Sequence, residues 1–145
     1  MNVESISNLP MKRLHADAVL PTRAHPEDAG LDLYGLEDVH LEPGEGKAVR
    51  TGIACALPRG CVGMIADRSS LGKRGLKTLG GIIDAGYRGE IQVLIRNLST
   101  EACLLRAGDR IAQMLILPIA TPQVQEVSEL DDTTRGTGGF GSTGA

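Results

Sequence analysis

The sequence predicts an all-β fold of the jelly-roll or distorted-barrel type, built from many short strands. Glycine and proline, 19 and 7 of the 145 residues, interrupt the chain at short intervals, and short apolar or alternating runs lie between them. A long run of apolar residues at the 3.6-residue helical period is missing from the sequence. These observations favour strands joined by turns over helices.

Seven segments are predicted as strands, because each is short, apolar or alternating, and bounded by turn residues. They are residues 16–20, 29–34, 47–57, 61–66, 90–97, 102–105 and 110–119. Turns are predicted where Gly and Pro cluster, at residues 42–46, 58–60 and 107–109.

The charge of the chain argues against binding to nucleic acid. The net charge is −3 and no block of Lys or Arg is present, whereas non-specific binding to a polyanion needs a broad basic face. A small anionic ligand is compatible with this charge, because local basic residues outweigh the global sign at short range.

The sequence predicts a cytoplasmic protein that does not enter a membrane. Residues 1–12 lack the apolar core of a signal peptide, and the most apolar stretch, residues 114–120, is too short to span a bilayer. The three cysteines, Cys55, Cys61 and Cys103, form no CxxC pair. We expect them to be small buried hydrophobes in a reducing compartment.

The C-terminal segment differs from the rest, and we expect a β-domain over residues 1–130 and a flexible Gly-rich lid over 131–145. Phe140 is the only Phe and lies among glycines rather than in an apolar run. Arg135 can pair with phosphate oxygens, the glycine amides can approach an anion, and Phe140 can stack on a base. The alternative is a disordered tail with no role.

A second polar segment, residues 66–75, concentrates Arg68, Lys73 and Arg74 beside Ser69 and Ser70. If residues 68–70 open a helical turn, their N–H groups can hold a phosphate. The alternative is a solvated charged loop.

Three further polar residues lie in or beside predicted strands. Asp84 follows an apolar strand, and Tyr87 comes three residues later; a turn-capping aspartate is the alternative. Asp32 interrupts an alternating strand, so it needs a partner if it is buried. Gln113 can face either side of its strand. Taken alone, the sequence favours a structural role for both Asp32 and Gln113.

These five segments, in this order and spacing, resemble the five motifs of the trimeric dUTPase family. The resemblance spans roughly residues 29–144, and its most specific parts are Ile-Asp-Ala-Gly-Tyr-Arg-Gly-Glu at 83–90 and Arg-Gly-Thr-Gly-Gly-Phe-Gly-Ser-Thr-Gly at 135–144. It implies a jelly-roll homotrimer with active sites at the subunit interfaces, where each C-terminal tail closes over a neighbouring site.

The resemblance implies Mg²⁺-dependent hydrolysis of dUTP to dUMP and pyrophosphate by attack of water on the α-phosphorus. Such an enzyme limits uracil incorporation into DNA and supplies dUMP for dTMP synthesis. By the resemblance, Asp84 orients or deprotonates the water, and Tyr87 packs under the deoxyribose. The backbone of a hairpin over residues 76–84, including Gly81 and Ile83, reads the uracil edge.

The resemblance also assigns the triphosphate and the lid. Arg135 binds the γ-phosphate and Phe140 stacks on uracil. Mg²⁺ is held by the triphosphate and waters, with Asp32 in an outer shell. The remaining phosphate contacts fall to Arg68, Ser69, Ser70 and Gln113, and the remaining lid contacts to Gly141 and Ser142.

The second motif departs from the usual pattern of the family, Pro-Arg-Ser-Gly-Leu-Ala. Here residues 67–72 read Asp-Arg-Ser-Ser-Leu-Gly, and Leu79 stands where Gly is common. The wording Arg-Ser-Ser-Leu is similar to dCTP deaminases of the same fold, but those enzymes use a catalytic Glu where this chain has Leu94. A non-catalytic dUTP-binding regulator is the second alternative.

Overall fold

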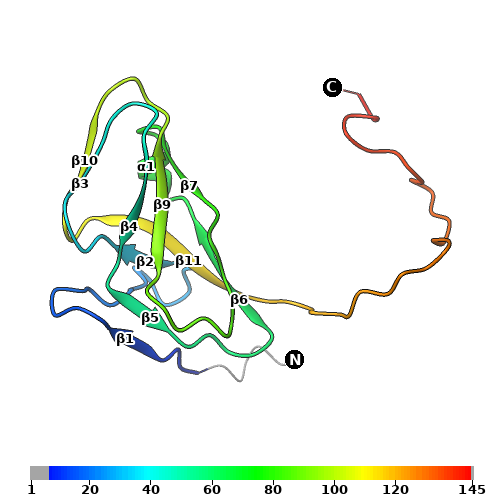
Figure 1. Cartoon of the computed structure of the whole chain (residues 1–145), viewed down its shortest axis with the longest axis horizontal. Helices are drawn as coiled ribbons and strands as arrows, with labels where there is room; N and C mark the ends of the chain where they lie inside the picture. Colours follow the sequence, from blue (N-terminus) through cyan, green and yellow to red (C-terminus); the bar gives the residue numbers. More distant parts are fainter. Residues whose placement is uncertain (1–6, 145) are drawn as a thin grey trace.

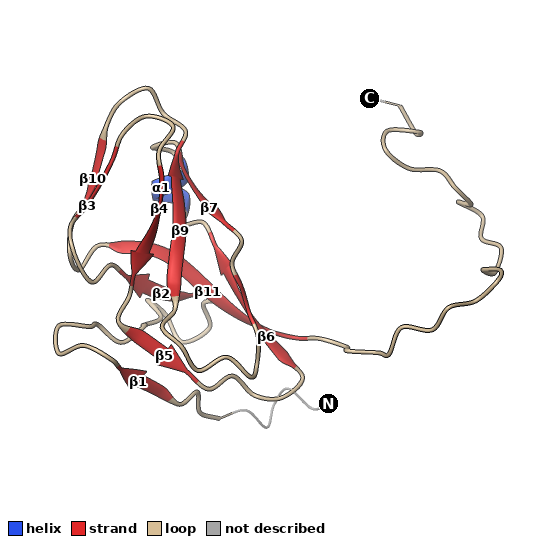
Figure 2. Cartoon of the chain, viewed as in Figure 1, coloured by secondary structure: helices blue, strands red, loops and turns tan. Residues whose placement is uncertain are grey.

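The chain folds almost entirely into β-strands, and the predicted all-β, jelly-roll class is confirmed (Figures 1 and 2). The structure is a computed structural model and describes residues 7–144, so residues 1–6 and Ala145 lie outside it. Its only helix within those residues is α1 (Ser69–Gly72). The strands are β1 (Met11–Arg13), β2 (Leu31–Tyr34), β3 (Val39–Leu41), β4 (Gly46–Arg50), β5 (Ile53–Cys55), β6 (Cys61–Ala66), β7 (Leu76–Leu79), β8 (Ile82–Ile83), β9 (Gln92–Asn97), β10 (Cys103–Leu105) and β11 (Arg110–Pro118).

Four antiparallel sheets make up the body. The largest has the strand order β2-β11-β6-β8, and a three-stranded sheet has the order β4-β9-β7; β1 pairs with β5, and β10 pairs with β3. The segment from β7 to β8 therefore passes from the three-stranded sheet to the four-stranded sheet. Strands β7 and β8 do not pair with each other, so residues 76–84 form a bend between two sheets and not the predicted hairpin. We keep the word hairpin below only as a name for this segment.

The core between the sheets is aliphatic. Strand β9 alternates strictly, with Val93, Ile95 and Asn97 buried and their neighbours exposed, as expected for a strand with one face on a core. Leu33 and Met114 are fully buried from the facing sheet. The aromatic residues therefore contribute no side chain to the buried core of residues 7–144.

The predicted strand at residues 16–20 is wrong. His15 and Ala18 form a turn, in which the Ala18 N–H donates to the His15 carbonyl at 3.1 Å, and only Ala18 of the five residues is buried. The first strand is instead β1, which pairs with β5. The apolar run at 16–20 was too short and too irregular to distinguish a strand from a turn that buries one methyl group.

The predicted strand at residues 47–57 is divided. Gly52 has φ +68°, a conformation that favours glycine, and it separates β4 from β5, which belong to different sheets. Strands β1, β3, β7 and β8 were not among the predicted strands, because each is only two to four residues long. The other predicted strands are found within two residues of their predicted ends.

Beyond Pro118 the chain leaves the body. Residues 119–144 contain no strand, and Figure 1 shows this segment running away from the sheets and curling back near its end. No helix among the described residues is long and apolar enough to cross a membrane.

Candidate active site

One cavity, which we call the arginine pocket, has a volume of ≈ 410 Å³ and is predominantly polar. It lies where β2, β11 and the start of α1 meet. Its walls are formed by Ala24, Asp28, Ala29, Gly30, Asp32, Arg68, Ser69, Ser70, Arg110 and Gln113. Five of the predicted site residues, from three separate segments of the sequence, are thus brought together here.

Asp32 lies between two guanidinium groups at the base of the arginine pocket. Its Oδ1 is 3.1 Å from Arg68 Nε and its Oδ2 is 3.8 Å from Arg110 Nε, and its side chain is only 15% exposed. The partner that a buried Asp32 requires is therefore present. The second carboxylate of the lining, Asp28, accepts the His25 N–H at 3.0 Å. The two guanidinium groups share the single carboxylate of Asp32, so some of their N–H groups remain for other acceptors.

A β-bulge in β11 determines which side chains enter this pocket. Asp32 pairs with Gln113 and Leu33 with Ala112, but Tyr34 pairs with Arg110, so Ile111 is the extra residue. In a regular strand, residues three apart point to opposite faces. The bulge puts Arg110 on the same face as Gln113, and Ile111 turns into the core, where it is 1% exposed.

Gln113 is held in place by two close approaches. Its Nε2 donates to the Asp67 carbonyl at 2.8 Å. A Cβ at Gly30 would lie 2.2 Å from Gln113 Oε1, so a larger residue at position 30 would displace the Gln113 amide from this orientation. The question of which way Gln113 faces is settled in favour of the arginine pocket.

Residues 68–70 do open a helical turn, as the phosphate-binding hypothesis required. Arg68 is the N-cap of α1, in an extended conformation with φ −88° and ψ 135°. The Leu71 and Gly72 N–H groups both donate to the Arg68 carbonyl. Among the described residues, the N–H groups of Ser69 and Ser70 have no backbone acceptor, and both residues line the arginine pocket.

A second cavity, the hairpin pocket, has a volume of ≈ 390 Å³. It is formed where β8 and β9 approach each other, and it is lined by Gly81, Ile82, Ile83, Asp84, Tyr87, Glu90, Gln92 and Leu94. Asp84 is exposed, and its carboxylate makes no hydrogen bond or ion pair within residues 7–144. The turn-capping role was the alternative for Asp84, and this free carboxylate does not fit it.

Tyr87 is pinned beside Asp84 by its own loop. Its hydroxyl donates to the Glu90 carbonyl at 2.8 Å, and its N–H donates to the Asp84 carbonyl at 3.0 Å. A Cβ at Gly89 would lie 2.6 Å from Tyr87 Cζ. Glycine at 89 therefore leaves room for the ring in this orientation, in which Tyr87 is 44% exposed.

Glu90 anchors this loop to the body. Its carboxylate accepts hydrogen bonds from Arg50 Nε at 3.2 Å and from the Gly52 N–H at 2.8 Å, and its side chain is 15% exposed. Burial raises the pKa of the Glu90 carboxyl, but the hydrogen bonds and the charge of Arg50 outweigh burial, so the pKa lies below its ordinary value.

The predicted tail residues are not brought to either pocket of the chain. Phe140 is fully exposed and has φ 51°. Arg135 Nε donates to the Gly138 carbonyl at 2.8 Å, within the tail itself. The arginine pocket and the hairpin pocket have no residue in common. The predicted tail residues form a third group, separate from both pockets: Arg135, Phe140, Gly141 and Ser142.

Two residues of the site region escaped the sequence analysis. Arg110 was assigned to a strand start, and the bulge that turns it into the pocket leaves no signal in the sequence. Asp67 was treated as part of a charged loop, although its side chain accepts hydrogen bonds from Thr78 in β7. Its change from the usual proline was the available signal.

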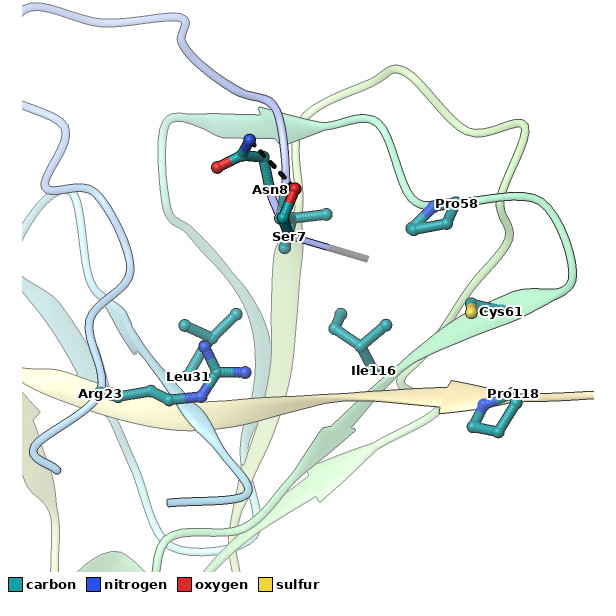
Figure 3. A pocket seen from close by; sticks show the side chains of 9 residues that line it. Ser7, Asn8, Arg23, Leu31, Pro58, Cys61, Ile116 and Pro118 are labelled. Atoms are coloured by element: carbon teal, nitrogen blue, oxygen red, sulfur yellow. Dashed lines mark hydrogen bonds between the residues drawn. The ribbon is translucent and has the colours of Figure 1, made fainter. Parts of the chain in front are cut away.

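A third cavity, of ≈ 250 Å³, lies on the side of the four-stranded sheet near the N-terminal segment (Figure 3). Figure 3 shows Ile116, Leu31 and Pro118 facing it, with Arg23 at its margin. It contains none of the predicted site residues.

Residues 7–144 contain no group of three or more His, Cys, Asp or Glu side chains that could hold a metal ion. Two carboxylates line the arginine pocket: the oxygens of Asp32 face guanidinium groups, and Asp28 accepts the His25 N–H. This donor set fits a Mg²⁺ ion that arrives with phosphate oxygens and water as its ligands, and does not fit a cage made by protein alone.

The fold and the arginine pocket together define a jelly-roll protein with a polar cavity lined by two arginines. Comparison with known proteins narrows this class. The dUTPase family model matches residues 16–144. The deoxyuridine 5'-triphosphate nucleotidohydrolases of Rhodococcus erythropolis and Clostridium kluyveri are 50% and 49% identical to the chain, over 94% and 92% of its length and 86% and 96% of their own.

Solved structures agree with these relatives. A mutant dUTPase of Staphylococcus bacteriophage 80alpha with dUpNHpp superposes with a TM-score of 0.92, at 32% identity, over 96% of this chain and 99% of that one. A mutant dUTPase from phage phi11 of S. aureus, described with a structural Mg(II) ion, gives a TM-score of 0.80 at 31% identity, over 84% and 97% of the two chains. The chain belongs to the dUTPase family.

The anchoring role of Glu90 predicts a pH-dependent stability difference. Because its pKa is lower in the folded chain than the ordinary 4.5, the ionised carboxylate stabilises the fold above about pH 4.5, and this contribution is lost as pH falls through the folded pKa. We expect Glu90→Gln to lower the free energy of unfolding by about 1–3 kcal/mol at pH 7. Urea denaturation at pH 7 and near pH 3 should show that the difference in the free energy of unfolding is smaller at the lower pH.

Glu126→Gln, in the exposed segment, is the control for Glu90→Gln. A difference in the free energy of unfolding that does not depend on pH would contradict the anchoring role of the Glu90 carboxylate.

Proposed function

We propose that this chain hydrolyses dUTP to dUMP and pyrophosphate, at active sites assembled from more than one copy of the chain. Its membership of the dUTPase family supports the reaction. The observation that carries the assembly is the separation of the predicted residues of one site into three groups, the arginine pocket, the hairpin pocket and the tail. An assembly of copies is the simplest way to bring them together.

The arginine pocket suits the triphosphate. Arg68 and Arg110 offer guanidinium groups, and Ser69, Ser70 and Gln113 offer neutral donors around the same cavity. Asp32 holds the two guanidinium groups through their Nε atoms, which leaves outer N–H groups of Arg110 for phosphate oxygens. Preorganised charge of this kind favours the transition state, because nothing needs to reorganise when charge develops.

The hairpin pocket suits the deoxyuridine. The backbone near Gly81 and Ile83 offers fixed donors and acceptors for the uracil edge, and the pinned ring of Tyr87 offers a flat surface that leaves no room for a 2′-hydroxyl. The free carboxylate of Asp84 then accepts a proton from, or orients, the attacking water. General-base assistance is typically worth about 10²–10⁴ in rate.

The tail supplies the lid in this proposal. Residues 131–145 close over a site of a neighbouring copy, where Arg135 binds the γ-phosphate and Phe140 stacks on uracil. Gly141 and Ser142 add contacts from the lid to the nucleotide. The fully exposed Phe140 supports this role, because an aromatic ring held in water is unfavourable unless a partner covers it. By family resemblance the assembly is a homotrimer.

Mg²⁺ enters the proposal as an ion bound mainly by the triphosphate and water, with Asp32 in an outer shell. When bound, it neutralises charge on the phosphate oxygens. Asp32 contributes by fixing the arginines and by facing the cavity with a carboxylate.

We also propose a cytoplasmic enzyme. Cys55, Cys61 and Cys103 are all free thiols, which suits a reducing compartment. The net charge of −3 argues against a nucleic acid as the ligand. It is compatible with dUTP and dUMP, because the arginines at the site outweigh it at short range.

The alternatives have weaker support. Leu94 lines the hairpin pocket where a deaminase of this fold would use a glutamate, and a leucine cannot shuttle a proton at the cytosine C4. A non-catalytic dUTP-binding regulator leaves the free carboxylate of Asp84 without a role.

One assay distinguishes the three functions. The protein is incubated with Mg²⁺ and either dUTP or dCTP, and pyrophosphate and ammonia are measured. We expect pyrophosphate from dUTP alone. Ammonia from dCTP would support the deaminase, and binding of dUTP without turnover would support the regulator.

The role of Asp84 predicts a specific loss in the chemical step. Asp84→Asn should preserve dUTP binding and lower kcat by at least about a hundredfold, because the amide cannot accept the proton of the water. Steady-state kinetics and calorimetric titration with a non-hydrolysable dUTP analogue measure the two effects. Asp17→Asn, at a carboxylate 83% exposed on the N-terminal turn, is the control. Turnover near the unmodified rate in Asp84→Asn would refute the base.

The lid predicts a loss of activity without a loss of stability. Truncation after Asp132 should lower kcat/KM by at least about tenfold, because contacts to γ-phosphate and base disappear. Tm measured without nucleotide should stay unchanged, since residues 133–144 are almost entirely exposed in their own chain. Phe140→Ala, which keeps the length of the tail, should give a part of this loss. A truncated enzyme with full activity would remove the tail from the mechanism.

A further inference from the structure

Asp67 occupies the junction between the end of β6 and the start of α1, and its side chain reaches across to β7. Oδ1 accepts hydrogen bonds from the Thr78 N–H and the Thr78 hydroxyl, both at 2.7 Å. Oδ2 pairs with Lys77 Nζ. One carboxylate therefore holds two consecutive residues of β7.

The backbone of Asp67 faces the other way. Its carbonyl accepts a hydrogen bond from Gln113 Nε2 at 2.8 Å, and the next residue, Arg68, lies against Asp32. Gln113, Arg68 and Asp32 all line the arginine pocket. The main chain of Asp67 is thus hydrogen-bonded to the arginine pocket. Its side chain is hydrogen-bonded to β7, the strand that leads into the hairpin pocket.

The hairpin has few other attachments on this side. Strand β7 is the edge of its sheet, paired only with β9. Beyond Leu79 the chain meets the four-stranded sheet through short β8, where Ile83 and Ile82 pair with Gly63 and Met64 of β6, and through the hydrogen bond from the Ile65 N–H to the Gly81 carbonyl at 2.7 Å. The Asp67 carboxylate supplies an acceptor to an edge-strand N–H that would otherwise face solvent.

The contacts of Asp67 are charge-assisted and partly shielded. Its side chain is 32% exposed, while Lys77 is 52% exposed. Partial burial raises the pKa of the Asp67 carboxyl, but hydrogen bonds from Lys77 and Thr78 outweigh it and hold the pKa below its ordinary value. The family motif has proline at this position, whose side chain cannot accept a hydrogen bond, so the clamp belongs to this chain's variant of the motif.

We propose that Asp67 is a positioning residue that fixes the uracil-reading hairpin, residues 76–83, relative to the arginine loop, residues 68–72. This inference rests on the proposed function. In this role Asp67 contacts neither the substrate nor the attacking water molecule. It sets the place of the hairpin backbone, and therefore the fit of uracil and the rejection of cytosine.

The test compares Asp67→Ala and Asp67→Asn with the unmodified full-length chain. The matched control is Asp38→Ala, because Asp38 also accepts a backbone N–H, from Ala107 at 2.8 Å, and lies near a cation, Arg106, outside both pockets. Three quantities are measured for each protein: Tm, the ratio of kcat/KM for dUTP to that for dCTP, and amide hydrogen exchange at Thr78.

We expect Asp67→Ala to reduce the dUTP-to-dCTP ratio by at least about tenfold, mainly through KM for dUTP, and to speed exchange at the Thr78 amide. Asp67→Asn keeps a carbonyl oxygen for Thr78 and should recover most of the selectivity. Asp38→Ala should keep the full ratio and the full protection of Thr78, even if its Tm falls by a similar amount.

Retained selectivity together with retained Thr78 protection in Asp67→Ala would overturn the proposal. If Asp67→Ala does not fold, Thr78→Val serves instead, because it removes only the hydroxyl donor; a ratio equal to that of the unmodified chain would then count against the clamp. An unmodified chain without dUTP hydrolysis would refute the proposed function, whereas the exchange measurement would still report on the clamp separately.

Discussion

The pairing of β11 with β2 on one side and β6 on the other is the constraint on which the site depends. This pairing places Asp32 opposite Gln113 and brings the end of β6, where Asp67 and Arg68 follow, beside the same strand. Because β6 also pairs with β8, one wall of the hairpin pocket belongs to the same sheet. The four-stranded sheet therefore contributes to both pockets, while β9 and the loop that carries Tyr87 complete the hairpin pocket.

Two glycines of the chain lie close against side chains that line the pockets. Glycine at 30 makes room for Gln113, and glycine at 89 makes room for the Tyr87 ring. In each case a methyl group would overlap the pocket-lining side chain, so the absence of a Cβ makes room for that side chain. This explains how a chain with few aromatic residues holds one of them in a fixed orientation at the edge of a pocket.

Charge in the molecule is organised locally. The chain is acidic overall, yet Asp32 gathers Arg68 and Arg110 at one cavity. Elsewhere, carboxylates connect separate segments through hydrogen bonds. Glu90 connects the Tyr87 loop to residues 50–52, and Asp67 connects β7 to the arginine loop. The carboxylate of Asp84 makes no such contact within residues 7–144, which suits the base role proposed for it.

The sequence by itself determined the fold class, the strands at 61–66 and 90–97 to within two residues, and the identity of the motif residues, because these depend on local alternation, turn chemistry and residue type. It did not show that 16–20 is a turn, since a short apolar run serves either purpose. Only the tertiary structure decided that Ile111 bulges and turns Arg110 into the pocket, that Asp67 reaches Thr78, and that the predicted site residues fall into three groups within one chain. Each of these depends on the register between distant strands, which is settled by the packing of the whole core and not by any local pattern.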